Sequence, residues 1–191
     1  MNNNLYAKRI ICSESMLSDE KINSLEHADE VMEKISNTTK LLENAPLYID
    51  DTKNITVDEI YEKCTKLKAD KNIKLIVIDN FELIQEKSEN YIERKCLQLD
   101  KLSRELKIPI IILTQLKEDV AKDPTLYDLD YNRVLADVPD VVIFLYTKDS
   151  NINDKNSKNL IDVKICKNRI GHVGDCKLEN LVDKYYKYSD I

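Results

Sequence analysis

The sequence predicts an α/β fold in which a mostly parallel sheet is flanked by helices. Three short apolar runs, each suited to one strand, occupy residues 73–78, 108–113 and 141–146. Runs with apolar residues at successive positions are typical of parallel strands that helices cover on both faces. Between the first two runs, apolar residues recur at intervals of three and four, as on one face of a helix: Ile92, Cys96, Leu99, Leu102 and Leu106. Residues 73–113 therefore have the strand, helix, strand order of a parallel sheet.

Helices are expected to dominate the chain before the first strand. Thr56 and Glu59 have the spacing of a capping box, and apolar residues at helical spacing follow them. A second amphipathic helix is predicted from Leu25 to Leu42, with Ser24 as its N-cap. Residues 47–50 have the composition of a short strand between the two helices.

The pattern changes to alternation from about residue 160. Ile161, Val163 and Ile165 alternate with Asp162 and Lys164, which is typical of half-buried antiparallel strands. We therefore expect one domain over residues 1–191. It comprises a helical lead-in (1–44), a core of sheet and helices (45–148) and C-terminal strands (160–188).

Composition limits the class of protein. The chain has 191 residues, 42% of them hydrophobic, a net charge of -6 and a pI near 5.1. It therefore lacks the broad basic field that draws a whole molecule onto nucleic acid. Five widely spaced cysteines, an odd number without a C-x-x-C pair, are expected to be reduced core residues and not metal ligands. With no signal-like N-terminus and no long apolar run, a soluble, cytoplasmic protein without a membrane span is expected.

Glycine content excludes two nucleotide-binding motifs. The chain contains two glycines, Gly171 and Gly174. Neither the G-x-x-x-x-G-K-[ST] phosphate loop nor the G-x-G-x-x-G turn can be built from them.

Polar side chains follow two of the apolar runs. Asp79 ends the first, where a carboxylate can hold a Mg²⁺-bound water beside a nucleotide triphosphate. Gln115 follows the second, where an amide can sense a terminal phosphate or orient a water. Each also has a structural interpretation, Asp79 as a turn or cap residue and Gln115 as an exposed turn residue.

Lys167 and Arg169 flank Asn168 at the end of the alternating segment. Residues two apart on a strand point to the same side, so the two side chains form a compact cationic pair. Such a pair can reach a phosphate bound by a neighbouring subunit, as an arginine finger does. Two solvated cations at a hairpin are the alternative.

Several segments together resemble the DnaB family of ring-shaped replicative helicases, whose motor has a RecA-like, P-loop NTPase-type fold. They are APLYIDDT, DEIYEKCTKLK, IKLIVIDNFELI, LKIPIIILTQL, PDVVIFLY and CKNRIGHVG. The resemblance extends from about Leu5 to Tyr188. It implies an ATP-dependent DNA helicase of DNA replication that uses Mg²⁺ and assembles as a homo- or hetero-oligomer of helicase subunits.

The residues at matching positions are expected to have the roles that they have in the family. Asp79 resembles the Walker B aspartate that supports Mg²⁺, and Gln115 resembles the glutamine that senses the nucleotide state. Lys167 and Arg169 match the cationic pair that completes the ATP site of the adjacent subunit. These four residues are thus the predicted catalytic set, with Asp79, Lys167 and Arg169 binding the cofactor and Asp79 the metal.

Three departures from the family pattern matter. The family's phosphate loop and catalytic glutamate lie upstream of Met1, so the sheet is expected to lack the phosphate-loop strand. Either the remaining strands close up, or another chain fills the gap. Residues 116–133 carry three basic and five acidic side chains, an unfavourable surface for DNA. The family's polar signature is also lost from residues 128–140.

Enzyme activity is therefore left open, with two main hypotheses and a third. The chain is a portion of a DnaB-like helicase, inactive when isolated, or a catalytically dead DnaB-like interaction or regulatory module. The third is a remnant of a prophage or mobile element. The motif composition alone does not separate them.

Overall fold

The computed structural model describes residues 3–24, 28–86, 90–116, 123–129, 133–147, 160–180 and 187–190. The chain divides into two compact units. The core unit comprises Thr52–Lys148 and Val163–Asp175, and the terminal unit comprises Met1–Asp51, Asp149–Asp162 and Cys176–Ile191. The four candidate residues all belong to the core unit. The interpretation of residues 1–191 as one domain stays a prediction.

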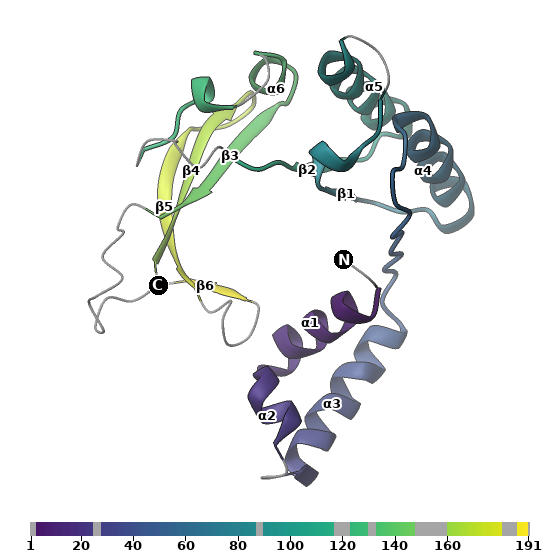
Figure 1. Ribbon diagram of the computed structural model, residues 1–191, viewed down its shortest axis with the longest axis vertical. Coiled ribbons are helices and arrows are strands. Elements are labelled where there is room, and N and C mark those ends of the chain that lie inside the picture. Colours follow the sequence, from purple (N-terminus) through teal and green to yellow (C-terminus); the bar gives the residue numbers. More distant parts are fainter. Residues whose placement is uncertain are drawn as a thin grey trace. The chain divides into compact units, whose positions relative to one another are not determined.

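The core unit has the predicted strand, helix, strand order. β1 (Ile76–Asp79) and β2 (Ile110–Leu113) pair in parallel, with Asp79 opposite Leu113. α4 (Val57–Lys71) and α5 (Tyr91–Leu106) pack together beside this pair (Figure 1). Their apolar residues form one core with Ile76, and Ile78, Ile110 and Ile112 pack against it.

The buried face of α5 is the centre of this core. Leu99 is 1% exposed and Leu102 is 0% exposed, and Ile92 and Cys96 are buried on the same face. The helical spacing predicted these positions. Lys107 ends the helix in the left-handed conformation, with φ of 54°, two residues before Pro109.

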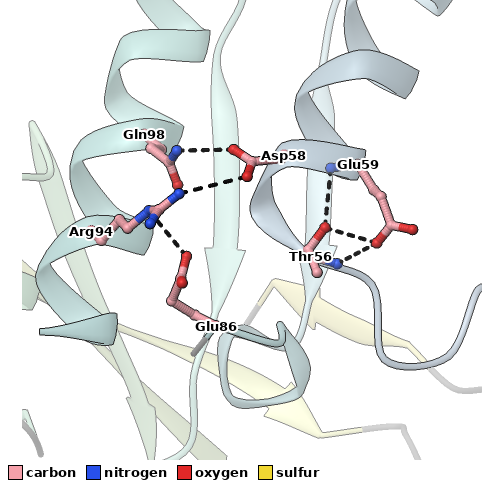
Figure 2. Close-up of polar contacts among 6 residues, drawn as sticks. All are labelled: Thr56, Asp58, Glu59, Glu86, Arg94 and Gln98. Atoms are coloured by element: carbon pink, nitrogen blue, oxygen red, sulfur yellow. Dashed lines mark hydrogen bonds and ion pairs between the residues drawn. The ribbon is translucent and has the colours of Figure 1, made fainter. Parts of the chain in front are cut away.

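α4 begins with the predicted capping box (Figure 2). The Thr56 hydroxyl accepts a hydrogen bond from the Glu59 backbone N–H at 3.3 Å, and the Glu59 carboxylate accepts one from the Thr56 N–H at 2.8 Å. The Thr56 hydroxyl also donates to this carboxylate at 2.8 Å. These bonds from Thr56, the backbone one foremost, lower the pKa of Glu59.

One local prediction in the N-terminal segment is wrong. Residues 47–50 form no strand, and their large apolar side chains are exposed. Ser24, predicted as the N-cap of a helix that starts at Leu25, lies at the C-terminal end of α2 (Asp19–Asn23), where its hydroxyl donates to the Lys21 carbonyl at 3.2 Å. Residues 25–27, where the predicted helix would begin, lie outside the described residues. The next helix, α3, is Ala28–Glu43.

One face of the strands is left uncovered, contrary to the expectation of helices on both faces. The third strand, β3, is Val141–Tyr146. Alternate apolar residues along β1, β2 and β3, together with the residue before β1, are between 43% and 54% exposed. We call these residues the apolar strand face: Leu75, Val77, Ile111, Leu113, Val141, Ile143 and Leu145. Within the described chain, helices cover β1 and β2 on one face, the face opposite these exposed residues.

The second sheet has the order β3, β4 (Leu160–Asn168), β5 (Gly174–Asn180) and β6 (Tyr188–Asp190). β5 and β6 pair antiparallel, as predicted for the C-terminal strands. Asp162, placed on the polar side of β4 by the alternation, is 7% exposed and lies 3.9 Å from the Lys177 ammonium. Since β2 and β3 belong to different sheets, these strands have not closed up.

The terminal unit begins with helices, as expected. α1 (Asn3–Ser15) packs against α3, and Cys12 and Val31 are buried. Among the described helices, none has the length and apolar character that crossing a bilayer requires.

Replacing Leu102 by Ala is expected to lower the free energy of unfolding by about 2–5 kcal/mol, because a fully buried side chain leaves a cavity. Leu97→Ala is the matched control on the same helix, since Leu97 is 50% exposed; its expected effect is within about 0.5 kcal/mol. Urea unfolding followed by circular dichroism measures both. Equal losses would contradict the assigned core.

The capping box makes part of the stability depend on pH. Because folding lowers the pKa of Glu59 below its ordinary value of 4.5, its contribution is present above that value and is lost as the pH falls through the folded pKa. Glu59→Gln is expected to lower the Tm at neutral pH, with the difference from wild type shrinking as the pH falls below 4.5. Glu62→Gln, an exposed position on α4, is the control. A difference that is constant across this range would sink the interpretation.

Candidate functional site

Asp79 and Gln115 lie at the same end of the β1–β2 sheet. Asp79 is the last residue of β1 and is opposite Leu113, two residues before Gln115. Both side chains are exposed. The parallel pairing therefore brings together two residues that the sequence analysis selected separately.

Glu82 ties the two strand ends together. It lies in the short 3-10 helix η1 (Phe81–Leu83) that follows β1. Its carboxylate accepts a short hydrogen bond from the Thr114 hydroxyl and one from the Gln115 backbone N–H at 3.2 Å. No sequence motif indicates this contact, because the partners are separated by more than thirty positions.

The side-chain oxygen atoms of Asp79 and of the neighbouring Asn80 are of the kind that Mg²⁺ prefers as ligands. The Asp79 carboxylate makes no hydrogen bond or ion pair within the described chain. The neighbouring Asn80 Oδ1 is buried without a hydrogen-bond partner there. No cluster of three or more metal-binding side chains occurs among the described residues. Mg²⁺ is commonly held by one or two carboxylates together with substrate phosphates and water, so Asp79 can supply one protein contact but not a complete site.

Lys167 and Arg169 both contact the segment that precedes β3. The Lys167 ammonium donates to the carbonyls of Ala136 and Asp137, each at 2.7 Å, at the end of α6 (Val134–Asp137). Arg169 pairs with the Asp140 carboxylate at 2.5 Å, and its backbone N–H donates to the Asp140 carbonyl at 2.9 Å. Each cation therefore has a partner inside the chain.

The two pairs of candidate residues are not joined to each other. Among the described residues, no hydrogen bond or ion pair connects Asp79 or Gln115 to Lys167 or Arg169. The Arg169 side chain is 50% exposed, so its guanidinium still faces solvent beside Asp140.

Half of the acidic segment predicted at residues 116–133 lies outside the described residues, which omit 117–122 and 130–132. Two of its acids are described, and each has a partner inside the chain. Asp123 pairs with Lys164 at 2.8 Å, and this hydrogen bond raises the pKa of Lys164. Asp128 accepts from the Thr125 N–H at 2.6 Å, a backbone bond that lowers the pKa of Asp128.

Lys95 is a buried charge that the sequence analysis did not select. It is 3% exposed on the apolar face of α5, and its ammonium lies 5.1 Å from the Phe81 ring centroid and 5.2 Å from that of Tyr91. Burial lowers the pKa of Lys95, and the charges of Glu82 and Glu86 oppose that shift. Helical spacing from Ile92 and Leu99 places Lys95 on the buried face of α5, and this spacing is the sequence feature from which its burial could have been predicted.

Burial also identifies the Cys96 thiol as structural. Desolvation raises the pKa of Cys96 to about 11. A thiol with this pKa stays protonated near neutral pH and is a poor nucleophile. The prediction that the cysteines are core residues is confirmed for Cys12, Cys64 and Cys96 and is wrong for Cys176, which is exposed.

Polar contacts bind α5 to the first turn of α4 and to the segment after η1 (Figure 2). Arg94 pairs with Glu86 at 3.2 Å and with Asp58 at 3.6 Å. Gln98 donates to the same Asp58 carboxylate at 3.1 Å. These contacts with α5 thus anchor the segment that follows β1.

Residues 1–190 match the family model described as "DnaB-like helicase C terminal domain". The chain belongs to this family. It is 32% identical over 96% of its length to the replicative DNA helicase DnaB of Geobacillus stearothermophilus. It is 30% identical over 96% of its length to the replicative DNA helicase DnaC of Bacillus subtilis (strain 168). The chain spans 42% of the length of each of these relatives.

Solved structures share its fold. A DnaB-like replicative helicase, studied with its interactions with primase, superposes with a TM-score of 0.88 at 27% identity, over all of this chain and 50% of that one. A separately solved ATPase domain gives 0.89 at 26% identity, over all of this chain and 72% of that one. The predicted RecA-like α/β class is confirmed.

Lys167→Met is expected to lower the free energy of unfolding by about 1–3 kcal/mol, because two carbonyls at the end of α6 lose a charged donor. Lys101→Met on α5 is the control, since the Lys101 side chain is 66% exposed; its expected effect is within about 0.5 kcal/mol. Urea unfolding compares the two variants. If they are equal, the Lys167 contacts contribute nothing to the fold.

Proposed function

We propose that this chain is a portion of a DnaB-type, ATP-dependent replicative DNA helicase that neither hydrolyses ATP nor unwinds DNA as an isolated chain. The observation that carries the proposal is the placement of Asp79 and Gln115 at the carboxyl end of paired parallel strands. Ligands of open α/β sheets bind at this end. The two glycines of the chain cannot supply a phosphate loop beside them.

The described residues support part of an ATP site. Magnesium-bound ATP supplies the phosphoryl group whose transfer to water drives a helicase motor. Asp79 would accept a hydrogen bond from a magnesium-bound water, and Gln115 would sense the terminal phosphate from β2. The phosphate loop and the residue that activates water would come from elsewhere in the assembly.

Helicase subunits are the proposed partners, in a homo- or hetero-oligomer. The apolar strand face supports this, because its seven aliphatic side chains are each between 43% and 54% exposed and their burial would favour association. Within such an assembly, Lys167 and Arg169 would face nucleotide bound by the neighbouring subunit. Arg169 would exchange Asp140 for phosphate, a better match to its fixed fork of donors.

A catalytically dead DnaB-like interaction or regulatory module, as in a prophage or mobile-element remnant, is the second candidate. The internal partners of both cations favour it, because Lys167 is occupied by carbonyls and Arg169 by a carboxylate. The excess of acidic residues between 116 and 133 also disfavours contact with DNA.

Phosphate release from ATP separates the candidates. The purified chain alone is expected to release none. Mixed with a phosphate-loop-bearing helicase subunit from the same source, the chain is expected to raise that subunit's rate, and Arg169→Ala is expected to abolish the stimulation, because an arginine finger is worth about 10³-fold or more in rate.

Arg104→Ala is the matched control, since Arg104 is 69% exposed in a pair within α5. If the chain alone released phosphate from ATP, and Asp79→Ala abolished this release, the proposed inactivity would be refuted. Binding to the helicase subunit without any dependence on Arg169 would instead establish the interaction module.

A further inference from the structure

Glu82 occupies a position from which it connects the two strand ends of the candidate site. It follows Asp79 by three residues, and its carboxylate accepts from both the Thr114 hydroxyl and the Gln115 N–H. A carboxylate oxygen can accept two donors at once, and bonds to an ionised acceptor are stronger than neutral ones. The contact thus spans from the end of β1 to the start of the segment after β2.

The backbone on either side of Glu82 is anchored in the core. Phe81 is 4% exposed and Ile84 is 3% exposed. The Gln85 N–H donates to the Ile55 carbonyl at 2.8 Å. Glu86 pairs with Arg94 of α5 at 3.2 Å. Glu82 therefore projects from a fixed turn and not from a free loop.

Lys95 supports the same turn from α5. Its ammonium lies within cation–π distance of the ring of Phe81, and Phe81 is the residue next to Glu82. A buried ammonium requires nearby negative charge, and Glu82 and Glu86 both attract Lys95. The turn that carries Glu82 is thereby held by packing, by hydrogen bonds and by charge.

On the far side, Gln115 has little other anchorage in the described chain. It follows the last residue of β2 by two positions, and its side chain is exposed. Its backbone N–H has Glu82 as acceptor. Without this carboxylate, the β2 ladder would fix the chain only as far as Leu113.

We propose that Glu82 is a positioning residue whose carboxylate fixes Gln115 relative to Asp79, so that the segment after β2 responds to what Asp79 binds. This role rests on the proposed function of Asp79 and Gln115. Glu82 itself touches neither nucleotide nor metal in this role. It acts through Gln115.

Amide hydrogen exchange of Gln115 in the full chain, measured by NMR, tests the contact without any need for ATPase activity. Glu82→Ala is expected to speed exchange at Gln115 by about tenfold, the loss of one charge-assisted acceptor. Glu82→Gln retains an acceptor oxygen and is expected to restore most of the protection. Glu62→Ala, at an exposed glutamate on α4, is expected to change nothing. The Leu99 amide in the core of α5 reports general stability.

Unchanged exchange at Gln115 in Glu82→Ala would overturn the proposal. So would an equal rise at Gln115 and Leu99, because it would mean general destabilisation. A second arm measures the stimulated ATPase of the mixture with the phosphate-loop subunit, where Glu82→Ala is expected to reduce the stimulation and Glu82→Gln to restore it. If wild type stimulates nothing, the proposed function fails while the exchange result still decides the position of Gln115. Faster exchange with full stimulation would overturn the coupling.

Discussion

The parallel pairing of β1 with β2 is the constraint on which the candidate site depends. Parallel strands end on the same side of a sheet, so their pairing puts Asp79 and Gln115 at one edge although thirty-five residues of chain separate them. α5 makes this pairing possible, because it is the crossover that returns the chain and the apolar body that covers the sheet. A loss of α5 packing would therefore disturb the site as well as the core.

The uncovered side of the same strands is the other feature that shapes the interpretation. Exposed aliphatic residues alternate with buried or half-buried ones along β1, β2 and β3, which is the pattern of a sheet with one packed face. In the described part of the chain, β2 has no strand partner besides β1, and β3 has none besides β4. Open edges and apolar faces are costly in water, which would give the proposed association with a helicase subunit a physical driving force.

Charge is used mainly for internal structure in the described chain. Lys167 caps the carbonyls of α6, Arg169 holds Asp140, and Lys95 lies buried against aromatic rings. These contacts explain why a motif match alone leaves two functional candidates. A cation that serves the fold of its own chain serves a neighbour's phosphate only if the gain exceeds the loss of its internal partner.

The sequence by itself determined the α/β class, the three core strands, the buried positions of α5 and the capping box of α4, because these depend on local periodicity and on residues within one helical turn. It also selected Asp79, Gln115, Lys167 and Arg169. It misjudged residues 47–50 and Asp162, where composition permits more than one placement. Only the tertiary structure decided that one strand face is bare, that Glu82 joins the two strand ends and that Lys95 is buried. These features depend on contacts between residues far apart in the chain, and no local pattern encodes which distant group a side chain will meet.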